Sequence, residues 1–223
     1  MPSMNFQLKL SLLFICVVWG ICIEGDDQRS SFRTSSSPDF PDSATICPDD
    51  LSVFRSSYVQ SSFDLNKLSG MWYEIAYHDL AQIKETCQYY DRKIISGSTM
   101  TELFGFTYAD RNVSGALHLK ADFDSTYRGV YQRYVDKPLV SNIKFKSVIV
   151  DVNLSSDSST YDTVSEYLCY KAGPVFYREV RIGSRNPTMD QSVLLALESK
   201  MKHLGVPFEA LRPADHSNCN YDH

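Results

Sequence analysis

The sequence predicts an all-β fold: an eight-stranded antiparallel up-and-down β-barrel with one C-terminal α-helix packed outside. The chain has 223 residues, 43% of them hydrophobic, with 14 Tyr and 12 Phe that favour a β-rich fold. Between residues 71 and 185, strand-like stretches alternate with short turn signals. After residue 186 the apolar spacing changes to that of a helix. Closing eight strands into a barrel would leave no exposed sheet edge.

The N-terminal segment resembles a secretory signal. Lys9 precedes an apolar run over residues 10–23, which is shorter than the roughly 20 residues of a membrane span. We therefore expect residues 1–25 to be a cleaved signal peptide, leaving a secreted or lumenal chain without a transmembrane segment. Residues 26–46 are rich in Ser and poor in aliphatic side chains, which predicts a disordered lead-in. The barrel domain then covers residues 47–223. Whether the lead-in carries a further targeting signal stays open.

The order of elements follows the turn signals. Residues 113–123 show the clearest alternation, with Leu117 and Leu119 on one face and His118 and Lys120 on the other. Eight strands are expected near residues 71–78, 86–96, 99–109, 112–123, 127–136, 143–154, 160–171 and 175–185. Each strand follows its neighbour through a short link, as in a meander.

A helix follows the last strand. Asn186 and Pro187 are candidates for its N-cap and first residue, and Thr188 with Gln191 fits a capping box. Its apolar stripe consists of Val193, Leu194, Leu197, Met201 and Leu204. Gly205 and Pro207 are expected to end it, and residues 208–212 could add a short final strand.

Two motifs resemble those of the lipocalins. Residues 63–76 (FDLNKLSGMWYEIA) resemble the first lipocalin signature, closest to the branch of apolipoprotein D, the bacterial lipocalins and the temperature-induced lipocalins. Residues 182–188 (IGSRNPT) resemble the last-strand signature. The resemblance implies that Arg185 stacks on Trp72, two residues after Gly70, and closes the barrel base. The middle signature, Thr-Asp-Tyr, is not intact here.

The cysteines indicate disulfides. After signal removal Cys47, Cys87, Cys169 and Cys219 remain, which allows two disulfides in three pairings. The resemblance to apolipoprotein D implies the pairs Cys47–Cys169 and Cys87–Cys219.

The inward strand faces are the candidate ligand site. Its residues are Glu102, Phe104, Phe106, Tyr108, Leu117, Leu119, Phe123 and Tyr131. They could line a cavity, or they could simply fill the barrel. Glu102 is a buried anchor if it points inward and a solvated side chain if the register shifts by one residue. The solvated alternative is favoured.

Charge and motifs exclude several functions. A net charge of −5 argues against nucleic-acid binding. Cys87 is the nearest candidate for the nucleophile of a lipocalin-type enzyme, but a disulfide would disable it. No hydrolase or phosphate-binding motif occurs, so we expect neither catalysis nor a cofactor. The C-terminal cluster Asp215, His216, Cys219, Asp222 and His223 is interpreted as a mobile polar tail, with no metal site.

Two sequons start at Asn112 and Asn153, where glycans could attach. The resemblance implies a secreted lipocalin that binds and transports a small hydrophobic ligand: a fatty acid, sterol, retinoid, carotenoid or tetrapyrrole. The alternative is a filled barrel that acts as an interaction protein, with a protein receptor or a second copy of the chain as partner.

Overall fold

The computed structural model describes residues 47–221, with gaps at 80–81, 83–84, 110–112, 139 and 173–174. The predicted signal peptide and Ser-rich lead-in lie outside the described residues. Within this part of the chain, no helix combines the length and the apolar character that crossing a membrane requires.

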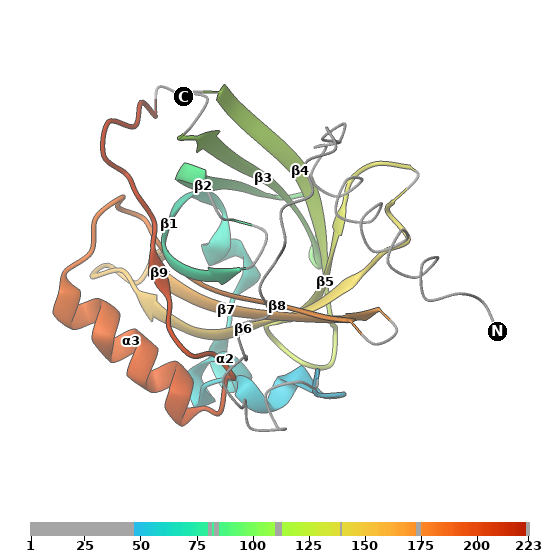
Figure 1. Ribbon diagram of the computed structural model, residues 1–223. Helices are drawn as coiled ribbons and strands as arrows, with labels where there is room; N and C mark the ends of the chain where they lie inside the picture. Colours follow the sequence, from blue (N-terminus) through green and yellow to red (C-terminus); the bar gives the residue numbers. More distant parts are fainter. Residues whose placement is uncertain are drawn as a thin grey trace, which may run out of the picture.

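Eight antiparallel strands form one closed sheet, which a short ninth strand extends (Figure 1). The strands are β1 (Gly70–Asp79), β2 (Glu85–Ile94), β3 (Thr99–Tyr108), β4 (Val113–Phe123), β5 (Val130–Val135), β6 (Phe145–Leu154), β7 (Tyr161–Ala172), β8 (Val175–Ser184) and β9 (Arg212–Pro213). Neighbours in sequence pair from β2 to β8, and β1 pairs with both β8 and β2 to close the barrel. The predicted meander and its closure are confirmed.

The closing strand β1 is shared unevenly between its neighbours. Residues 70–73 pair with β2, whereas residues 73–79 pair with β8. Beyond Tyr73 the free edge of β1 pairs with β9 through Ala76 and Tyr77. The segment after β9 therefore completes the wall where β1 and β2 separate. The predicted final strand at residues 208–212 was wrong in its extent, because only Arg212 and Pro213 pair.

The outer helix α3 (Gln191–His203) packs against the outside of the barrel, as predicted (Figure 1). The predicted start at Asn186–Thr188 was wrong. Asp190 is the N-cap, since its carboxylate accepts a hydrogen bond from the backbone N–H of Ser192 at 2.7 Å. Leu194, Leu197 and Met201 form the buried face.

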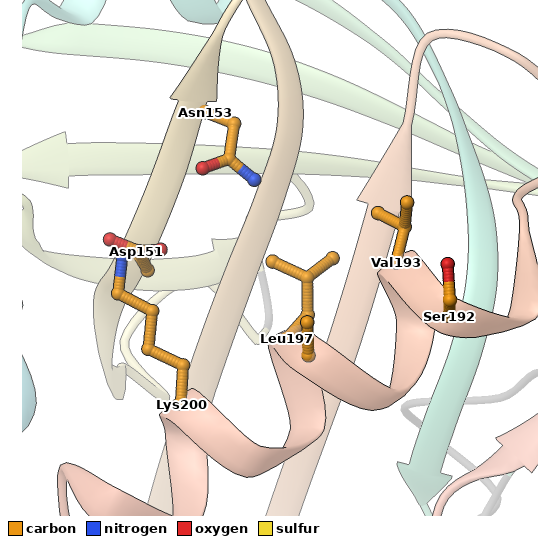
Figure 2. Close-up of a pocket in the computed structure, with 7 residues that line it drawn as sticks. Asp151, Asn153, Ser192, Val193, Leu197 and Lys200 are labelled. Carbon is orange, nitrogen blue, oxygen red and sulfur yellow. Dashed lines mark ion pairs between the residues drawn. The ribbon is translucent and has the colours of Figure 1, made fainter.

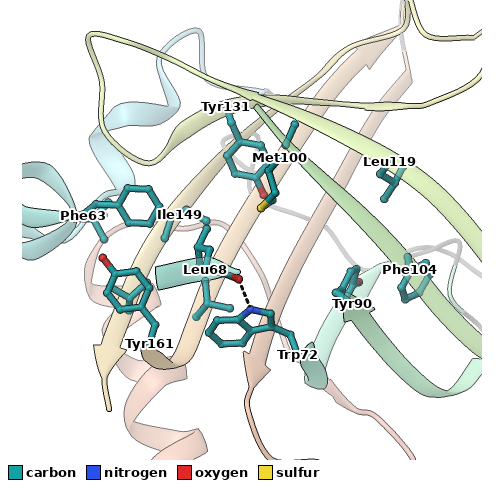
Figure 3. Close-up of a cluster of buried hydrophobic side chains, with 14 of the residues drawn as sticks. Phe63, Leu68, Trp72, Tyr90, Met100, Phe104, Leu119, Tyr131, Ile149 and Tyr161 are labelled. Carbon is teal, nitrogen blue, oxygen red and sulfur yellow. Dashed lines mark hydrogen bonds between the residues drawn. The ribbon is translucent and has the colours of Figure 1, made fainter. Parts of the chain in front are cut away.

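Three short helical segments precede the barrel and were not predicted. They are η2 (Leu51–Phe54), α2 (Ser57–Ser62) and η3 (Leu65–Leu68). Each begins at a side-chain cap, namely Asp50, Ser56 and Asp64 respectively. Val59 and Leu68 are fully buried. Since Leu68 and Val59 share a core cluster with Trp72, η3 and α2 cover the base of the barrel (Figure 3). The η2 residues Leu51 and Phe54 pack instead in the outer cluster with α3.

Two cores hold the molecule together. The first lies inside the barrel and at its base, and includes Trp72, Tyr90, Phe104 and Tyr131 (Figure 3). The second lies between the outer barrel wall and α3, and includes Val148, Val180, Leu197 and Met201. Strand residues alternate between the two cores because successive side chains point to opposite faces.

Candidate functional site

The base of the barrel is closed by an arginine and a tryptophan. The Arg185 guanidinium carbon lies 3.9 Å from the Trp72 ring centroid. The same guanidinium donates hydrogen bonds of 2.8–3.0 Å to four backbone carbonyls, those of Lys67, Ser69, Met71 and Tyr161. The Trp72 indole N–H donates to the carbonyl of Leu68 at 2.7 Å. The pair that the resemblance implied is therefore present.

Gly70 makes room for this arrangement. Its φ is +99°, a backbone conformation that residues with a side chain rarely adopt. A Cβ at this position would lie 3.2 Å from Arg185 Nη1. The glycine of the first motif therefore permits the turn into β1 and the approach of the guanidinium.

All eight predicted ligand residues face the barrel interior, but the structure separates them into two groups. Phe104, Phe106 and Tyr108 form a series of ring contacts along β3, with centroids 5.2 and 5.1 Å apart. Leu117 and Leu119 face them from β4, opposite Phe104 and Glu102. These residues occupy the end of the barrel away from Trp72, which we call the mouth half.

Phe123 and Tyr131 lie elsewhere. Their rings stack at 4.8 Å, and Phe123 also stacks on Phe63 at 6.0 Å. Phe63 stacks in turn on Tyr161, whose hydroxyl accepts a hydrogen bond from the Asp64 N–H at 2.7 Å. These rings belong to the base (Figure 3).

Glu102 separates the two groups, and the favoured prediction that it is solvated was wrong. It is 2% exposed, because the register of β3 aligns it with the inward-facing Phe104 and Met100. Arg92 lies 2.7 Å from its carboxylate, Arg181 3.3 Å and Arg133 3.5 Å. Arginines on three other strands thus neutralise a carboxylate that β3 places in the interior.

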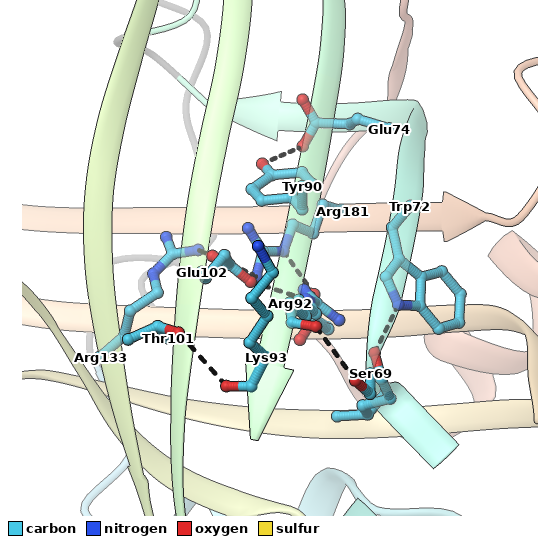
Figure 4. Close-up of polar contacts among 12 residues, drawn as sticks. Ser69, Trp72, Glu74, Tyr90, Arg92, Lys93, Thr101, Glu102, Arg133 and Arg181 are labelled. Atoms are coloured by element: carbon cyan, nitrogen blue, oxygen red, sulfur yellow. Dashed lines mark hydrogen bonds and ion pairs between the residues drawn. The ribbon is translucent and has the colours of Figure 1, made fainter. Parts of the chain in front are cut away.

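Glu102 belongs to an ion-pair layer across the middle of the barrel. The layer comprises Arg92, Arg133, Arg181, Glu102, Glu166 and Glu179. Figure 4 shows its three arginines around Glu102. Glu166 accepts from Arg92 at 2.7 Å and from Arg181 at 2.5 Å. Glu179 pairs with Arg133, and lies 3.4 Å from Arg181. The three positive and three negative side chains balance, which a low-dielectric interior requires.

The layer holds Glu102 and Glu166 ionised. Burial opposes ionisation of Glu102 and Glu166, but Arg181 and Arg92 outweigh it and keep the pKa of both carboxyls below its usual value. The Tyr131 hydroxyl also donates a hydrogen bond of 2.9 Å to Glu166 Oε1. Sequence reasoning missed the layer, although Arg92, Arg133 and Arg181 each sit at alternate, inward positions of a predicted strand.

Glu74 lies on the mouth side of this layer. Its Oε1 accepts a hydrogen bond from the Tyr90 hydroxyl at 3.0 Å, and its Oε2 has no hydrogen-bond partner among the described residues. Tyr90 is held between the Arg181 guanidinium, 4.2 Å from its ring centroid, and the stacked ring of Phe104 at 4.8 Å. Burial raises the pKa of Glu74 to about 8. The carboxyl is therefore mostly protonated at neutral pH.

The Cys47–Cys169 and Cys87–Cys219 disulfides are both present, in the pairing that the resemblance implied. Cys169 is on β7, and Cys87 is on β2 where that strand has separated from β1. The segment beyond β9 is held between β1 and β2. The backbone N–H of Ala214 donates to the Ile75 carbonyl on β1, and that of Cys87 on β2 donates to the Asp215 carbonyl, both at 2.9 Å. Since Cys87 is oxidised, it offers no thiol nucleophile.

The C-terminal tail, residues 214–221, is packed, so its interpretation as mobile was wrong. His216 Nε2 lies 2.6 Å from the Glu74 carbonyl, and its Nδ1 contacts the Tyr221 hydroxyl. The Tyr221 ring lies against Tyr73 at 4.7 Å. Among the described residues, no group of three His, Cys, Asp or Glu is placed to hold a metal ion. Asp222 and His223 lie outside those residues.

Of the two sequons, the one at Asn153 lies wholly within the described residues. Asn112, just before β4, is outside the described residues. Asn153 is exposed on β6, facing α3, and donates an amide hydrogen to Thr163 Oγ1 at 2.8 Å.

Comparison with known proteins shows the fold. No family model matches the chain. No curated protein matches it either. Solved structures do match, among them lobster apocrustacyanin A1, with 17% identity over 74% of this chain and 87% of that one and a TM-score of 0.56.

Two further matches agree with the first. Insecticyanin from the tobacco hornworm Manduca sexta has 16% identity, covers 70% of this chain and 82% of its own, and gives a TM-score of 0.55. The bovine lipocalin allergen Bos d 2 has 15% identity, covers 71% and 99%, and gives a TM-score of 0.51. The chain therefore has the lipocalin fold: a closed eight-stranded barrel with an outer helix.

Proposed function

We propose that the protein binds a small, predominantly apolar ligand in the mouth half of its barrel. The observation that carries this proposal is the gradient of burial along β3. Met100, Glu102 and Phe104 are at most 2% exposed, Phe106 is 7% exposed, and Tyr108 is only half-buried. On β4, Leu117 is likewise half-buried opposite Phe104. An apolar wall that becomes accessible toward one end of a barrel is the environment in which apolar ligands bind.

The ion-pair layer limits how deep the ligand can enter. Moving an apolar group past Arg92, Arg181 and Glu166 would separate buried charges, which costs several kcal/mol. The ligand would therefore occupy the space between this layer and the mouth. The rings of Phe104, Phe106 and Tyr108 favour a flat, conjugated body, as in a retinoid, carotenoid or tetrapyrrole, over a long fatty acid or a sterol.

The loop after β5 covers part of this region. Val140 is buried and Ile143 half-buried, and both belong to the interior core cluster with Leu119 and Val135. Entry of a ligand would displace these two side chains. Hydrophobic burial at about 25 cal/mol per Å² would supply the binding energy.

The biological setting that we propose is secretion and transport. The N-terminal signal, the two disulfides and the resemblance to the apolipoprotein D branch support a secreted carrier and argue against an enzyme. The fold and the cysteine pairing are compatible with this setting.

A second candidate function is that of an interaction protein with a filled barrel. Two observations favour it: the ion-pair layer occupies the centre of the barrel, and Val193 and Leu195 on α3 are exposed. Its partner would be a receptor or a second copy of the chain.

Ligand titration of matched variants distinguishes the two functions. The fluorescence of Trp72 is a poor reporter of ligand binding, because Tyr90 and Arg92 lie between the indole and the mouth half. We would therefore titrate retinol, oleic acid, cholesterol and haem, and count bound ligand by native mass spectrometry. Leu117→Trp narrows the mouth half, whereas Leu195→Trp makes the same change on the exposed face of α3.

The expected result is saturable uptake of one ligand per chain, weakened at least tenfold by Leu117→Trp and unchanged by Leu195→Trp. Absence of uptake for every ligand, or equal uptake by both variants, would overturn the proposal and favour the filled-barrel interaction protein.

A further inference from the structure

A groove of about 370 Å³ runs along the outside of the barrel between α3 and β6 (Figure 2). A volume above about 300 Å³ is enough for a small organic ligand. Its lining includes Asp151, Asn153, Ser192, Val193, Leu197 and Lys200. It lies on the opposite side of the barrel wall from the proposed ligand site, so it requires its own explanation.

The groove has an apolar side and a polar end. Val193 is 42% exposed and lies beside the buried Leu197 on the helix. At the other end Lys200 Nζ lies 2.6 Å from the Asp151 carboxylate (Figure 2). A surface with an apolar wall and hydrogen-bonding groups at its rim is complementary to a pyranose ring, which has C–H faces and polar edges.

Asn153 provides a covalent attachment point within this groove. It is the first residue of the sequon Asn153-Leu154-Ser155, at the end of β6. Its amide nitrogen carries two hydrogens and donates one of them to Thr163 Oγ1. The second hydrogen can be replaced while the bond to Thr163, which fixes the side chain beside α3, is kept.

We propose that Asn153 carries an N-linked glycan whose first N-acetylglucosamine lies in this groove, against Val193 and Leu197, and holds α3 onto β6. The sugar is transferred from a lipid-linked diphosphate oligosaccharide. The Asn153 N–H bond is lost, a bond from Nδ2 to sugar C1 forms, and the lipid diphosphate leaves with the bonding pair while the proton passes to the medium. This proposal rests on passage through the secretory pathway and is independent of ligand binding.

The experiment uses the full chain secreted from eukaryotic cells that make only oligomannose glycans, with Asn112→Gln so that one sequon remains. Mass spectrometry of the intact protein reports occupancy. One portion is trimmed with endoglycosidase H, which leaves the first sugar. Another is treated with peptide N-glycosidase F, which removes the whole glycan and converts the carrier asparagine to an aspartate. Asn153→Gln provides an unglycosylated chain without that added charge.

The expected result is an occupied Asn153 and a trimmed protein with the same Tm as the fully glycosylated one. Complete removal and Asn153→Gln should both lower Tm by about 2–4 °C, the shift for a small loss of stability in a chain of this size. Val193→Ser should abolish the difference between trimmed and unglycosylated protein. Leu195→Ser, at an exposed position of the same helix that does not line the groove, should preserve it.

Two outcomes would overturn the proposal. If Asn153 is unmodified in the secreted chain, the proposed glycan does not exist. The proposed packing against α3 would be refuted if Asn153 is occupied but the single remaining sugar gives no gain in Tm. It would also be refuted if Leu195→Ser has the same effect as Val193→Ser.

Discussion

The base of the barrel and the ion-pair layer above it both hold guanidinium groups, half-buried in the base (Arg185) and fully buried in the layer (Arg92 and Arg181), but the partners of these groups differ. Arg185 donates to neutral carbonyls and lies on the face of Trp72. Arg92 and Arg181 instead meet the carboxylates of Glu102 and Glu166. The base can therefore lose its arginine without leaving an unpaired buried charge, whereas each member of the layer depends on the others.

Trp72 connects the two regions. The Arg92 guanidinium lies 5.7 Å from its ring centroid, and that of Arg185 lies 3.9 Å away. Both guanidinium groups therefore lie against the same indole. The two regions differ in what a sequence can show. The pair of Trp72 and Arg185 lies in two short motifs, whereas the charges of the ion-pair layer come from several strands and balance only when the barrel has formed.

The largest effect is expected in the ion-pair layer. Glu166→Gln removes the carboxylate that Arg92 and Arg181 share, and leaves a surplus of buried positive charge. We expect a loss of about 3–5 kcal/mol in the free energy of unfolding, measured by urea denaturation. The double variant Glu166→Met with Arg181→Met removes one charge of each sign and should lose less. Equal losses in the two variants would contradict the interdependence of the layer.

A smaller effect is expected at the base. Arg185→Ala removes the four hydrogen bonds to carbonyls and the contact with Trp72, but it leaves no buried carboxylate without a partner. We expect a loss of about 3 kcal/mol by the same method. Arg185→Lys should recover only part of it, because an ammonium cannot replace the planar fork. A loss larger than that of Glu166→Gln would reverse the comparison.

The third effect is a dependence on pH that originates next to the layer. In the unfolded chain Glu74 ionises near its ordinary pKa of 4.5, and in the folded protein near 8. Between these values unfolding releases a proton, so stability falls as pH rises, by at most about 1.4 kcal/mol per pH unit. Below pH 4.5 and above pH 8 this contribution is constant.

Glu74→Gln should flatten the dependence of the unfolding free energy on pH between about pH 5.5 and 7.5. Over this interval the wild type should lose about 2 kcal/mol more stability than the variant. The exposed Glu209→Gln changes the net charge equally and should leave the slope as it is. An unchanged slope in Glu74→Gln would assign the pH dependence to another group.

The smallest effect is expected at the boundary of the two regions. The ring of Tyr131 stacks on Phe123 in the base, while its hydroxyl donates to Glu166 in the layer. Tyr131→Phe keeps the stacking and removes only the hydrogen bond, for an expected loss of about 1.5 kcal/mol. In the Glu166→Gln background the same substitution should cost less, and a thermodynamic cycle of the four proteins measures the difference.

The strands were predicted to within a few residues because alternation is a local property. The main differences have local causes as well: β5 begins at Val130, since the Asp124 carboxylate accepts from the N–H groups of Thr126 and Tyr127 and extends the turn. The start of α3 was misplaced because Asn186, Thr188 and Asp190 are all acceptable caps, and only packing against β6 and β8 selects among them.

The candidate site was predicted in part. The inward placement of Phe104, Phe106 and Leu119 followed from the period of two. The period of two did not show that Phe123 lies in the base and Phe104 in the mouth half. Strand tilt and stagger determine which residues of different strands lie at the same height along the barrel axis. The error on Glu102 has the same origin, since a carboxylate is expected in solvent until the arginines that neutralise it are known to face it.

The sequence by itself determined the strand order, because periodicity and turn signals are local properties, and its resemblance to the lipocalin motifs implied the closing pair of Trp72 and Arg185. Tertiary structure alone decided that six charged side chains would meet in the barrel interior and that Asn153 would lie beside α3. The physical reason is that the energy of a buried charge depends on partners up to 79 residues away, such as Arg181 for Glu102, whose positions are fixed only when the barrel closes.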